Sequence, residues 1–226
     1  MKKLIFGLTA IAGIAGVAAL TYQFAVRPFR SWGTSPEQSA RALPGDELLP
    51  DASGGETRTI TIEAPPASVW PWLVQMGYGR GGWYSFDAMD TGASSNAILP
   101  EFQSLAEGDL VPANADSGLI VRRLDPGHAL VLYIDSGMTG EQSGQKSPMD
   151  MSATWAFVLD ELPDNRTQLV ERIRFQFGDT DKPWLRHTLP MMGFGAFMVL
   201  RKQLEGIKQR AEHTQEPVLN PAKATV

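Results

Sequence analysis

The chain of 226 residues contains no cysteine. This absence excludes disulfide bonds, zinc–thiolate sites, iron–sulfur clusters and cysteine nucleophiles. The sequence also lacks Gly-x-Ser-x-Gly and His-Glu-x-x-His motifs, and its three histidines, His128, His187 and His213, lie far apart without a second ligand at metal spacing. We therefore expect neither a metal site nor another cofactor.

Nucleotide-binding loops are missing as well. The stretch from Gly77 to Gly82 is rich in glycine, but it follows an expected helix rather than a strand, and no βαβ pattern surrounds it. The segment from Gly140 to Ser147 ends in Gly-Gln-Lys-Ser, whereas a phosphate loop needs glycine directly before the lysine. The sequence therefore indicates no nucleotide cofactor.

Positive charge is scarce after the first 30 residues. Those residues hold four basic side chains and no acid, which leaves 16 bases against 25 acids and a charge of −9 in the remainder. Such a surface repels nucleic acid and anionic lipid headgroups, unless a local basic patch outweighs the average. We expect no nucleic-acid partner.

One long uncharged run is present, from Leu4 to Val26, with two lysines before it and Arg27 and Arg30 after it. As a helix these 23 residues span roughly 34 Å, which is enough to cross a bilayer. The alternative is a cleaved signal peptide, but its apolar region is usually only about 7 to 15 residues long. We predict a retained single-pass membrane anchor at residues 1–30. The basic flanks are nearly balanced, so the side of the membrane that holds the domain stays open.

Three segments follow the anchor. Residues 31–56 form a juxtamembrane lead-in, where Ser35, Pro36 and Gln38 have the spacing of a capping box and predict a short helix that ends at Pro44 and Gly45. Residues 57–212 have the length of one domain with its own core. Residues 213–226 are expected to be a disordered tail.

Hydrophobic periodicity assigns the elements of the main domain. The segment from Thr57 to Ala64 alternates with period 2 and predicts a strand, after which Val69, Trp70 and Leu73 recur at helical spacing. A C-terminal helix from His187 to about Arg210 is apolar on nearly every face in its first half. The other expected strands are Leu110 to Pro112, Leu119 to Leu124, Ala129 to Ile134, Ser152 to Leu162 and Thr167 to Phe177.

This order of elements predicts an α+β fold in which a curved antiparallel sheet wraps around the long C-terminal helix. A curved sheet and a single helix cannot touch everywhere, so we expect an apolar cavity between them. Arg172 and Arg174 alternate onto the opposite face and are expected to be solvated. Alternatively, each of the inward residues is simply part of the hydrophobic core. The inward residues are Trp155, Phe157, Leu159, Ile173, Phe175, Phe177, Met191, Met192, Phe194, Phe197 and Met198.

Several stretches together resemble the membrane-anchored members of the SRPBCC superfamily, the helix-grip domains that include START lipid-transfer proteins, polyketide cyclases/dehydrases and plant pathogenesis-related allergens. The resemblance covers about 80 residues of the N-terminal half, and it implies a hydrophobic cavity and often a lipid, hormone or polyketide ligand. The stretches are Trp32-Gly33-Thr34, Leu43-Pro44-Gly45-Asp46, Ile60 to Pro66, Val69 to Gly77, Arg80-Gly81-Gly82-Trp83-Tyr84-Ser85 and Gly108 to Pro112.

The glycines around Arg80 allow a tight turn that would bring Arg80, Trp83 and Tyr84 to the cavity. There the arginine could hold a carboxylate, phosphate or carbonyl while the aromatics pack the apolar body of the ligand. The alternative is a structural clamp, with Arg80 bound to loop carbonyls and Trp83 in the core. Asp87 and Asp90 have a spacing that suits acid–base work or a metal site, although most such pairs are solvated surface.

Three functions are compatible with these features. The first is a membrane-tethered domain that binds or transfers a hydrophobic small molecule or lipid without chemistry. The second is a polyketide-cyclase-like enzyme acting on an apolar carbonyl substrate, with Arg80, Tyr84 and Asp87 as catalytic candidates. The third is a structural or assembly protein whose cavity is filled by its own side chains. Ligand identity and oligomeric state stay open.

Overall fold

The structure of the protein is a computed structural model that describes residues 31–86, 93–135, 151–177 and 183–214, with the backbone alone described at 135 and 183–194. The expected membrane anchor at residues 1–30 lies outside the described residues, as does most of the expected tail. Within the described ranges, no helix is both long enough and apolar enough to cross a membrane.

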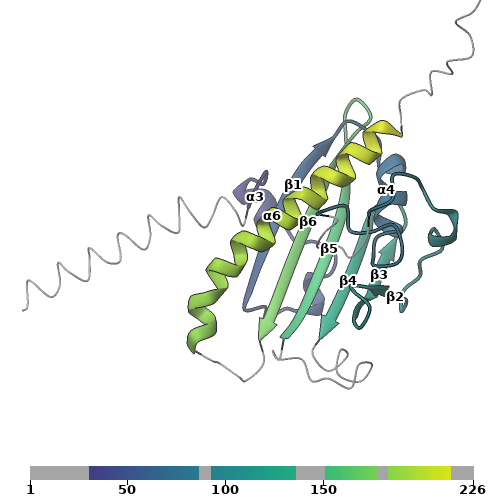
Figure 1. Cartoon of the computed structure of the whole chain (residues 1–226). Coiled ribbons are helices and arrows are strands. Elements are labelled where there is room, and N and C mark those ends of the chain that lie inside the picture. Colours follow the sequence, from purple (N-terminus) through teal and green to yellow (C-terminus); the bar gives the residue numbers. More distant parts are fainter. Residues whose placement is uncertain (1–30, 87–92, 136–150, 178–182, 215–226) are drawn as a thin grey trace, which may run out of the picture.

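A six-stranded antiparallel sheet forms the centre of the molecule, with strand order β1-β6-β5-β4-β3-β2 (Figure 1). The sheet is curved, and the β5–β6 hairpin turns at Asp164 and Asn165, both of which have positive φ. The expected strands are confirmed, although β1 begins earlier than Thr57. Their bounds are β1 Gly54–Ile62, β2 Leu110–Pro112, β3 Gly118–Asp125, β4 Ala129–Asp135, β5 Met151–Leu162 and β6 Arg166–Phe177.

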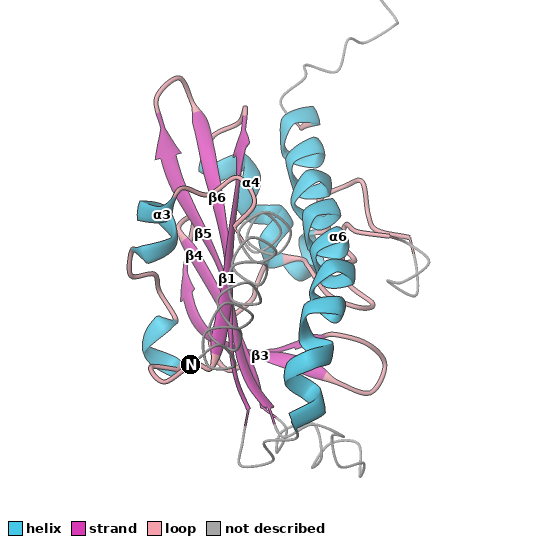
Figure 2. Ribbon diagram, turned by 90° about the vertical axis from the view of Figure 1, so that its left-hand side faces the viewer, coloured by secondary structure: helices cyan, strands magenta, loops and turns pink. Residues whose placement is uncertain are grey.

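Two helices cover the inner face of the sheet. Helix α4 (Pro66–Val74) starts with proline in its first turn, where the missing N–H donor costs little. Helix α6 (Pro183–His213) runs diagonally across the sheet, and Figure 2 shows it on one side with α3 (Pro36–Ala40) on the other. A sheet gripping one long C-terminal helix is the α+β arrangement predicted for a helix-grip fold. Two short 3-10 helices, η2 (Asp46–Leu48) and η3 (Pro100–Phe102), complete the described elements.

Helix α6 buries one stripe of side chains at helical spacing. The stripe contains Phe197, Leu200, Leu204, Ile207 and Ala211, all of them buried. Together with inward residues of the sheet and α4, the last three belong to the main hydrophobic core. The second half of α6 therefore packs against the core of the domain.

The lead-in packs on the outer face of the sheet. Ser35 and Gln38 form both bonds of the predicted capping box, and α3 ends at Ala40, before Pro44, because Arg41 is extended. Leu43 packs with three outward residues of the sheet in a small second core, formed with Ala129, Val158 and Val170. The lead-in therefore belongs to the folded unit as a third layer.

Arg172 is buried by this third layer, so the expectation that it is solvated was wrong. Its guanidinium donates to the carbonyls of Arg41 at 2.8 Å and Ser39 at 2.9 Å and to the carboxylate of Asp46 at 2.6 Å. Arg174 donates to the carbonyl of Leu49 at 2.9 Å and is partly covered. Alternation placed both arginines on the correct face, but it could not show that residues 31–53 cover that face.

Candidate functional site

The antiparallel register lines up the inward side chains in rows across the sheet. Glu171 and Arg58 are direct partners in one of these rows, so two ionisable groups face α6 among apolar neighbours. Read from β4 through β5 and β6 to β1, three consecutive rows are Leu130-Phe157-Glu171-Arg58, Leu132-Trp155-Ile173-Glu56 and Ile134-Ala153-Phe175-Gly54.

Arg58 and Glu171 form a buried ion pair beneath α6. The Nη1 atom of Arg58 lies 3.7 Å from Oε2 of Glu171, and neither side chain has any exposed surface. The Nη2 atom of Arg58 also contacts the carboxylate of Glu56, while Nε1 of Trp155 donates to Oε1 of Glu171 at 2.8 Å. The guanidinium lies 5.9 Å from the ring centroid of Phe197. One cation is therefore shared by two carboxylates under the helix.

Three atoms of this pair have unused hydrogen-bonding capacity. Nε and Nη1 of Arg58 and Oε2 of Glu171 are buried and have no hydrogen-bond partner within the described part of the chain. Burial raises the pKa of Glu171 to about 7, although nearby Arg58 and the bond from Trp155 lower it. Near neutral pH the carboxyl group can be protonated or ionised. The pair can therefore donate to and accept from a third polar group.

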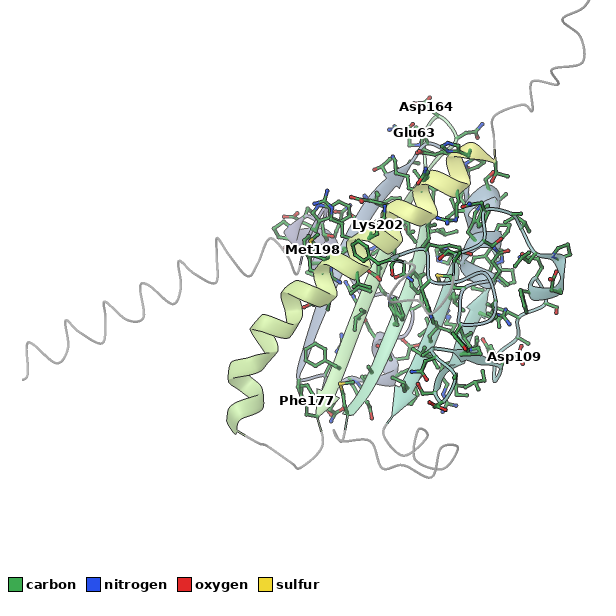
Figure 3. The ribbon with its side chains drawn as sticks, viewed as in Figure 1. Glu63, Asp109, Asp164, Phe177, Met198 and Lys202 are labelled. Atoms are coloured by element: carbon green, nitrogen blue, oxygen red, sulfur yellow. The ribbon has the colours of Figure 1, made fainter. Side chains whose placement is uncertain are left out.

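Apolar side chains next to the pair are only half-buried. They occupy the inner face towards the end of the sheet where Figure 3 labels Phe177, whereas Phe157 and Leu169, farther along the same face, are completely buried. The ring of Phe175 lies over Gly54, where an added Cβ would come within 2.5 Å of it. An apolar surface that stays partly accessible beside a buried polar pair suits an apolar ligand. The half-buried set is Trp155, Ile173, Phe175 and Phe177.

The apolar residues predicted to bind a ligand do not all face the space between α6 and the sheet. Met198 was expected to face the strands, but it is 42% exposed, because the helical repeat turns Phe197 and Leu200 towards the sheet instead. Figure 3 shows Met198 on the same helix as Lys202. The side chains of Met191 and Phe194 are not among those that the structure describes. Four strand residues face inward as predicted, namely Trp155, Phe157, Phe175 and Phe177.

Arg80 is bound to the backbone, as the structural alternative for this residue proposed. Its Nε donates to the carbonyl of Met76 at 3.1 Å, and its Nη2 donates to the carbonyls of Val74 at 3.0 Å and Phe102 at 3.3 Å. The guanidinium also lies 4.7 Å from the centroid of the Phe102 ring. These contacts occupy carbonyls at the end of α4 and in η3, and we do not include Arg80 in the candidate site.

Tyr84 is held within the core. Its hydroxyl donates to the carbonyl of Trp72 at 3.0 Å, its φ of 59° is positive, and its side chain is 2% exposed. Burial raises the pKa of the phenol, which disfavours proton release. Trp83 donates to the carbonyl of Ala113 at 3.3 Å and stacks on Trp155 with ring centroids 5.3 Å apart. Trp83 therefore supports the Trp155 side of the candidate site, and Tyr84 supports the fold.

The third catalytic candidate, Asp87, lies outside the described residues, as does Asp90. Nδ1 of His128 lies 3.2 Å from the carbonyl oxygen of Leu159, and Nδ1 of His213 lies 2.7 Å from that of Gln209. Within the described ranges, no group of three or more acidic or histidine side chains could hold a metal ion.

Sequence reasoning missed Arg58, Glu56 and Glu171. The available signal was the period of 2 that assigned the apolar residues: Glu171 has the same parity as Ile173, and Arg58 has the same parity as Ile60. Both charged residues therefore belonged to the inward faces. Their pairing depends on the register between β1 and β6, which are separated by more than 100 residues in the chain.

No family model matches the chain, and no curated protein matches it significantly. Solved structures similar to it include protein MLL2253 from Mesorhizobium loti, 17% identical over 70% of this chain and 98% of that chain, with a TM-score of 0.42. The Polyketide_cyc-like protein Cgl2372 from Corynebacterium glutamicum is 14% identical over 72% of this chain and 93% of that chain, with a TM-score of 0.41. Ara h 8.0201 is 16% identical over 71% and 96% of the respective chains, with a TM-score of 0.37. At identities and TM-scores this low, these likenesses assign neither a ligand nor an activity to this chain.

Proposed function

We propose that the protein is a membrane-tethered, SRPBCC-like domain that binds a hydrophobic small molecule or lipid between α6 and the inner face of the sheet. The observation that carries this proposal is the buried ion pair of Arg58 and Glu171, whose Nη1 and Oε2 atoms have no hydrogen-bond partner among the described residues, next to apolar side chains that are only half-buried. The ligand carries a hydroxyl or carbonyl group that this pair recognises.

The chemistry of the pair supports that choice of ligand group. A buried donor or acceptor without a partner costs about 1–3 kcal/mol, and a bound polar group that completes its hydrogen bonds recovers that cost. A hydroxyl oxygen can accept from Nη1 of Arg58 while its hydrogen is donated to Oε2 of Glu171. A carbonyl oxygen can accept from Nη1 alone, or also from Glu171 when that carboxyl is protonated.

The apolar part of the site supports a hydrophobic body for the ligand. Trp155, Ile173, Phe175 and Phe177 share one face of the β5–β6 hairpin, and they extend from the row next to the polar pair towards the end of the sheet. Covering such side chains contributes roughly 25 cal/mol for each Å² of apolar surface removed from water. This arrangement separates the two tasks, because the aromatic face provides affinity and the pair provides orientation.

The proposed membrane tether rests on the sequence alone. Its basis is the uncharged run from Leu4 to Val26, with basic residues on both sides. Hydrophobic ligands partition into bilayers, so an anchored domain encounters them at high local concentration. Sequencing the mature N-terminus checks this point, since loss of residues 1–30 would contradict a retained anchor.

The binding proposal can be tested by analysing what copurifies with the full chain. The protein is purified in an uncharged detergent and extracted with organic solvent, and the extract is analysed by mass spectrometry against a detergent blank. We expect an apolar molecule with a hydroxyl or carbonyl group, and at least about tenfold lower recovery from Arg58→Met. Arg122→Met is the matched control, because Arg122 is exposed. No apolar molecule above the blank, or equal recovery from both variants, would refute the proposal.

A second candidate function is supported by the pKa of Glu171, which lies at about 7 and suits a general acid or base at neutral pH. This second function is a polyketide-cyclase-like reaction. It would use Glu171 for proton transfer and Arg58 to stabilise negative charge on a carbonyl oxygen of the substrate. The test is to incubate the copurified molecule with wild type and with Glu171→Gln. Conversion by wild type alone, with binding kept in both, favours the enzyme, whereas unchanged molecule in both cases favours a binding protein.

A further inference from the structure

A second site lies on the other side of β1, in a pocket of about 510 Å³ between that strand and the lead-in. The side chains that matter for its chemistry are those of Arg41, Arg172, Arg174 and Asp46, which line the pocket together with Gly55. None of these four side chains belongs to the inner pair of Arg58 and Glu171. The pocket therefore provides a separate polar environment.

Positive charge exceeds negative charge among these groups. Asp46 is the only one of the four that is acidic, and its carboxylate serves two guanidiniums, with Oδ2 2.6 Å from Nη1 of Arg172 and Oδ1 3.4 Å from Nη1 of Arg174. Arg41 is paired instead with Asp160. Arg172 and Arg174 thus share one counter-charge. Glu56 also lines the pocket, but its carboxylate contacts Arg58.

Arg174 is the group with spare capacity. Its Nη2 donates to the carbonyls of Leu49 at 2.9 Å and Pro50 at 3.3 Å, but its buried Nε has no hydrogen-bond partner among the described residues. The crowding of cations is also visible at Arg172, whose pKa is lowered first by burial and then by Arg174 and Arg41, against the effect of Asp46. An anion in the pocket would relieve this repulsion.

The free edge of β1 adds a backbone donor. Thr59 donates its N–H to the carbonyl of Trp32 at 3.1 Å, so the odd-numbered residues of β1 direct their backbone groups away from β6. Gly55 has the same parity, is exposed, and has no backbone partner on this edge among the described residues. Its N–H can therefore donate to a ligand in the pocket.

We infer that this pocket binds a phosphate group, held by Arg174 and the edge of β1. The guanidinium fork matches phosphate oxygens, and a backbone N–H at a free strand edge complements it. Phosphate could come from a lipid headgroup or from a soluble ion. Ser31, which lines the pocket, directly follows the expected membrane anchor in the sequence, so lipid phosphate is accessible if the anchor is retained.

The test is calorimetric titration of the full chain in an uncharged detergent, near neutral pH and at low salt. The two titrants are inorganic phosphate and dihexanoyl phosphatidic acid. We expect Arg174→Gln to raise the Kd for phosphate roughly tenfold or more, since it removes a charge-assisted contact. Arg122→Gln should leave the Kd unchanged, and added sodium chloride should weaken binding to wild type.

A second substitution changes the charge of the pocket and keeps the hydrogen bonds that Arg174 donates to the lead-in. Ala40 is exposed and lines the pocket, so Ala40→Glu places a negative charge there, while Ala40→Gln is its uncharged match. We expect weaker phosphate binding in Ala40→Glu alone. Tighter binding of the short-chain lipid than of phosphate identifies the headgroup as the source, and equal affinity identifies the soluble ion. Absence of phosphate binding to wild type, or an unchanged Kd in Ala40→Glu, would overturn the inference, whatever happens at the inner site.

Discussion

The guanidinium of Arg58 and the carboxylate of Glu171 meet at 3.7 Å on the inner face of the sheet, where neither side chain is exposed to solvent. This pair connects β1 to β6 directly under α6, and within the described ranges it leaves hydrogen-bonding capacity unused on both partners. Burial of opposite charges is expensive, and it is compensated only when both partners are present. The pair therefore affects both stability and ligand binding, and variants can separate the two effects.

Removing the cation should destabilise the fold strongly. In Arg58→Met the carboxyl group of Glu171 stays buried without its guanidinium, and we expect the free energy of unfolding to fall by about 3–5 kcal/mol. Thermal or urea unfolding of the full chain measures this, with Arg122→Met expected to stay within about 0.5 kcal/mol of wild type. The double variant Arg58→Met/Glu171→Met should regain most of the loss. A single variant as stable as wild type would contradict the pairing.

The pH dependence of stability should change in Glu171→Gln. The pKa of Glu171 is raised from 4.5 to about 7 on folding, so in this window the folded protein holds a proton that the unfolded chain releases. The contribution of Glu171 to stability is therefore complete below pH 4.5 and is lost as pH rises towards about 7. Glutamine does not titrate, so the stability of wild type relative to this variant should fall with rising pH.

The maximum slope is about 1.4 kcal/mol per pH unit for one proton. Urea unfolding at steps between about pH 5 and about pH 8 measures it. Glu161→Gln is the control, since Glu161 is exposed on the same hairpin. A pH-independent difference between wild type and Glu171→Gln would show that the carboxyl group of Glu171 titrates normally.

Two glycines of α6 should respond oppositely to the same substitution. An added Cβ at Gly206 would lie 2.2 Å from the carbonyl oxygen of Tyr84, whereas at Gly195 it would meet no described atom within 4 Å. Alanine is favoured over glycine in a helix by up to about 1 kcal/mol, so Gly195→Ala should be neutral or stabilising. Gly206→Ala should be destabilising, because the backbone at Tyr84 or in α6 would have to move to make room for the methyl group. Melting temperatures of the two variants test the close contact between α6 and the Tyr84 loop.

Tyr84→Phe should affect stability and leave ligand binding unchanged. The substitution removes the donor to the carbonyl of Trp72, and we expect a loss of about 1 kcal/mol. Recovery of the copurified molecule should match that of wild type, because this hydroxyl is enclosed in the core. Normal stability combined with lost binding or turnover would instead return Tyr84 to the functional site.

Local patterns predicted the elements well. Ser35 and Gln38 stand at the spacing of a capping box, and the bonds that define it are both present. Proline at the start of α4 and period-2 alternation in β5 and β6 act within a few residues of chain, so they can be recognised without knowing the fold. The starts of β1 and α6 were less well predicted, since strand pairing and packing extend elements beyond their local signals.

The Arg80 loop shows what such local patterns leave open. Its glycines correctly indicated a tight turn, but the same turn can present an arginine to a ligand or to carbonyls of its own chain. The carbonyls of Met76, Val74 and Phe102 accept from it in the folded protein. Whether Arg80 binds a ligand or these carbonyls depends on where η3 and the end of α4 lie in space. Sequence spacing does not contain that information.

The amino-acid order alone determined the α+β class, the strand and helix order and the inward parity of Trp155, Phe175 and Phe177, because alternation and helical repeat are properties of a local backbone. Tertiary structure decided that Glu171 meets Arg58 and that residues 31–53 cover Arg172. Both outcomes join segments more than 100 residues apart. Contacts of that range are selected by the packing of the whole chain, so they become visible only once the layers are assembled.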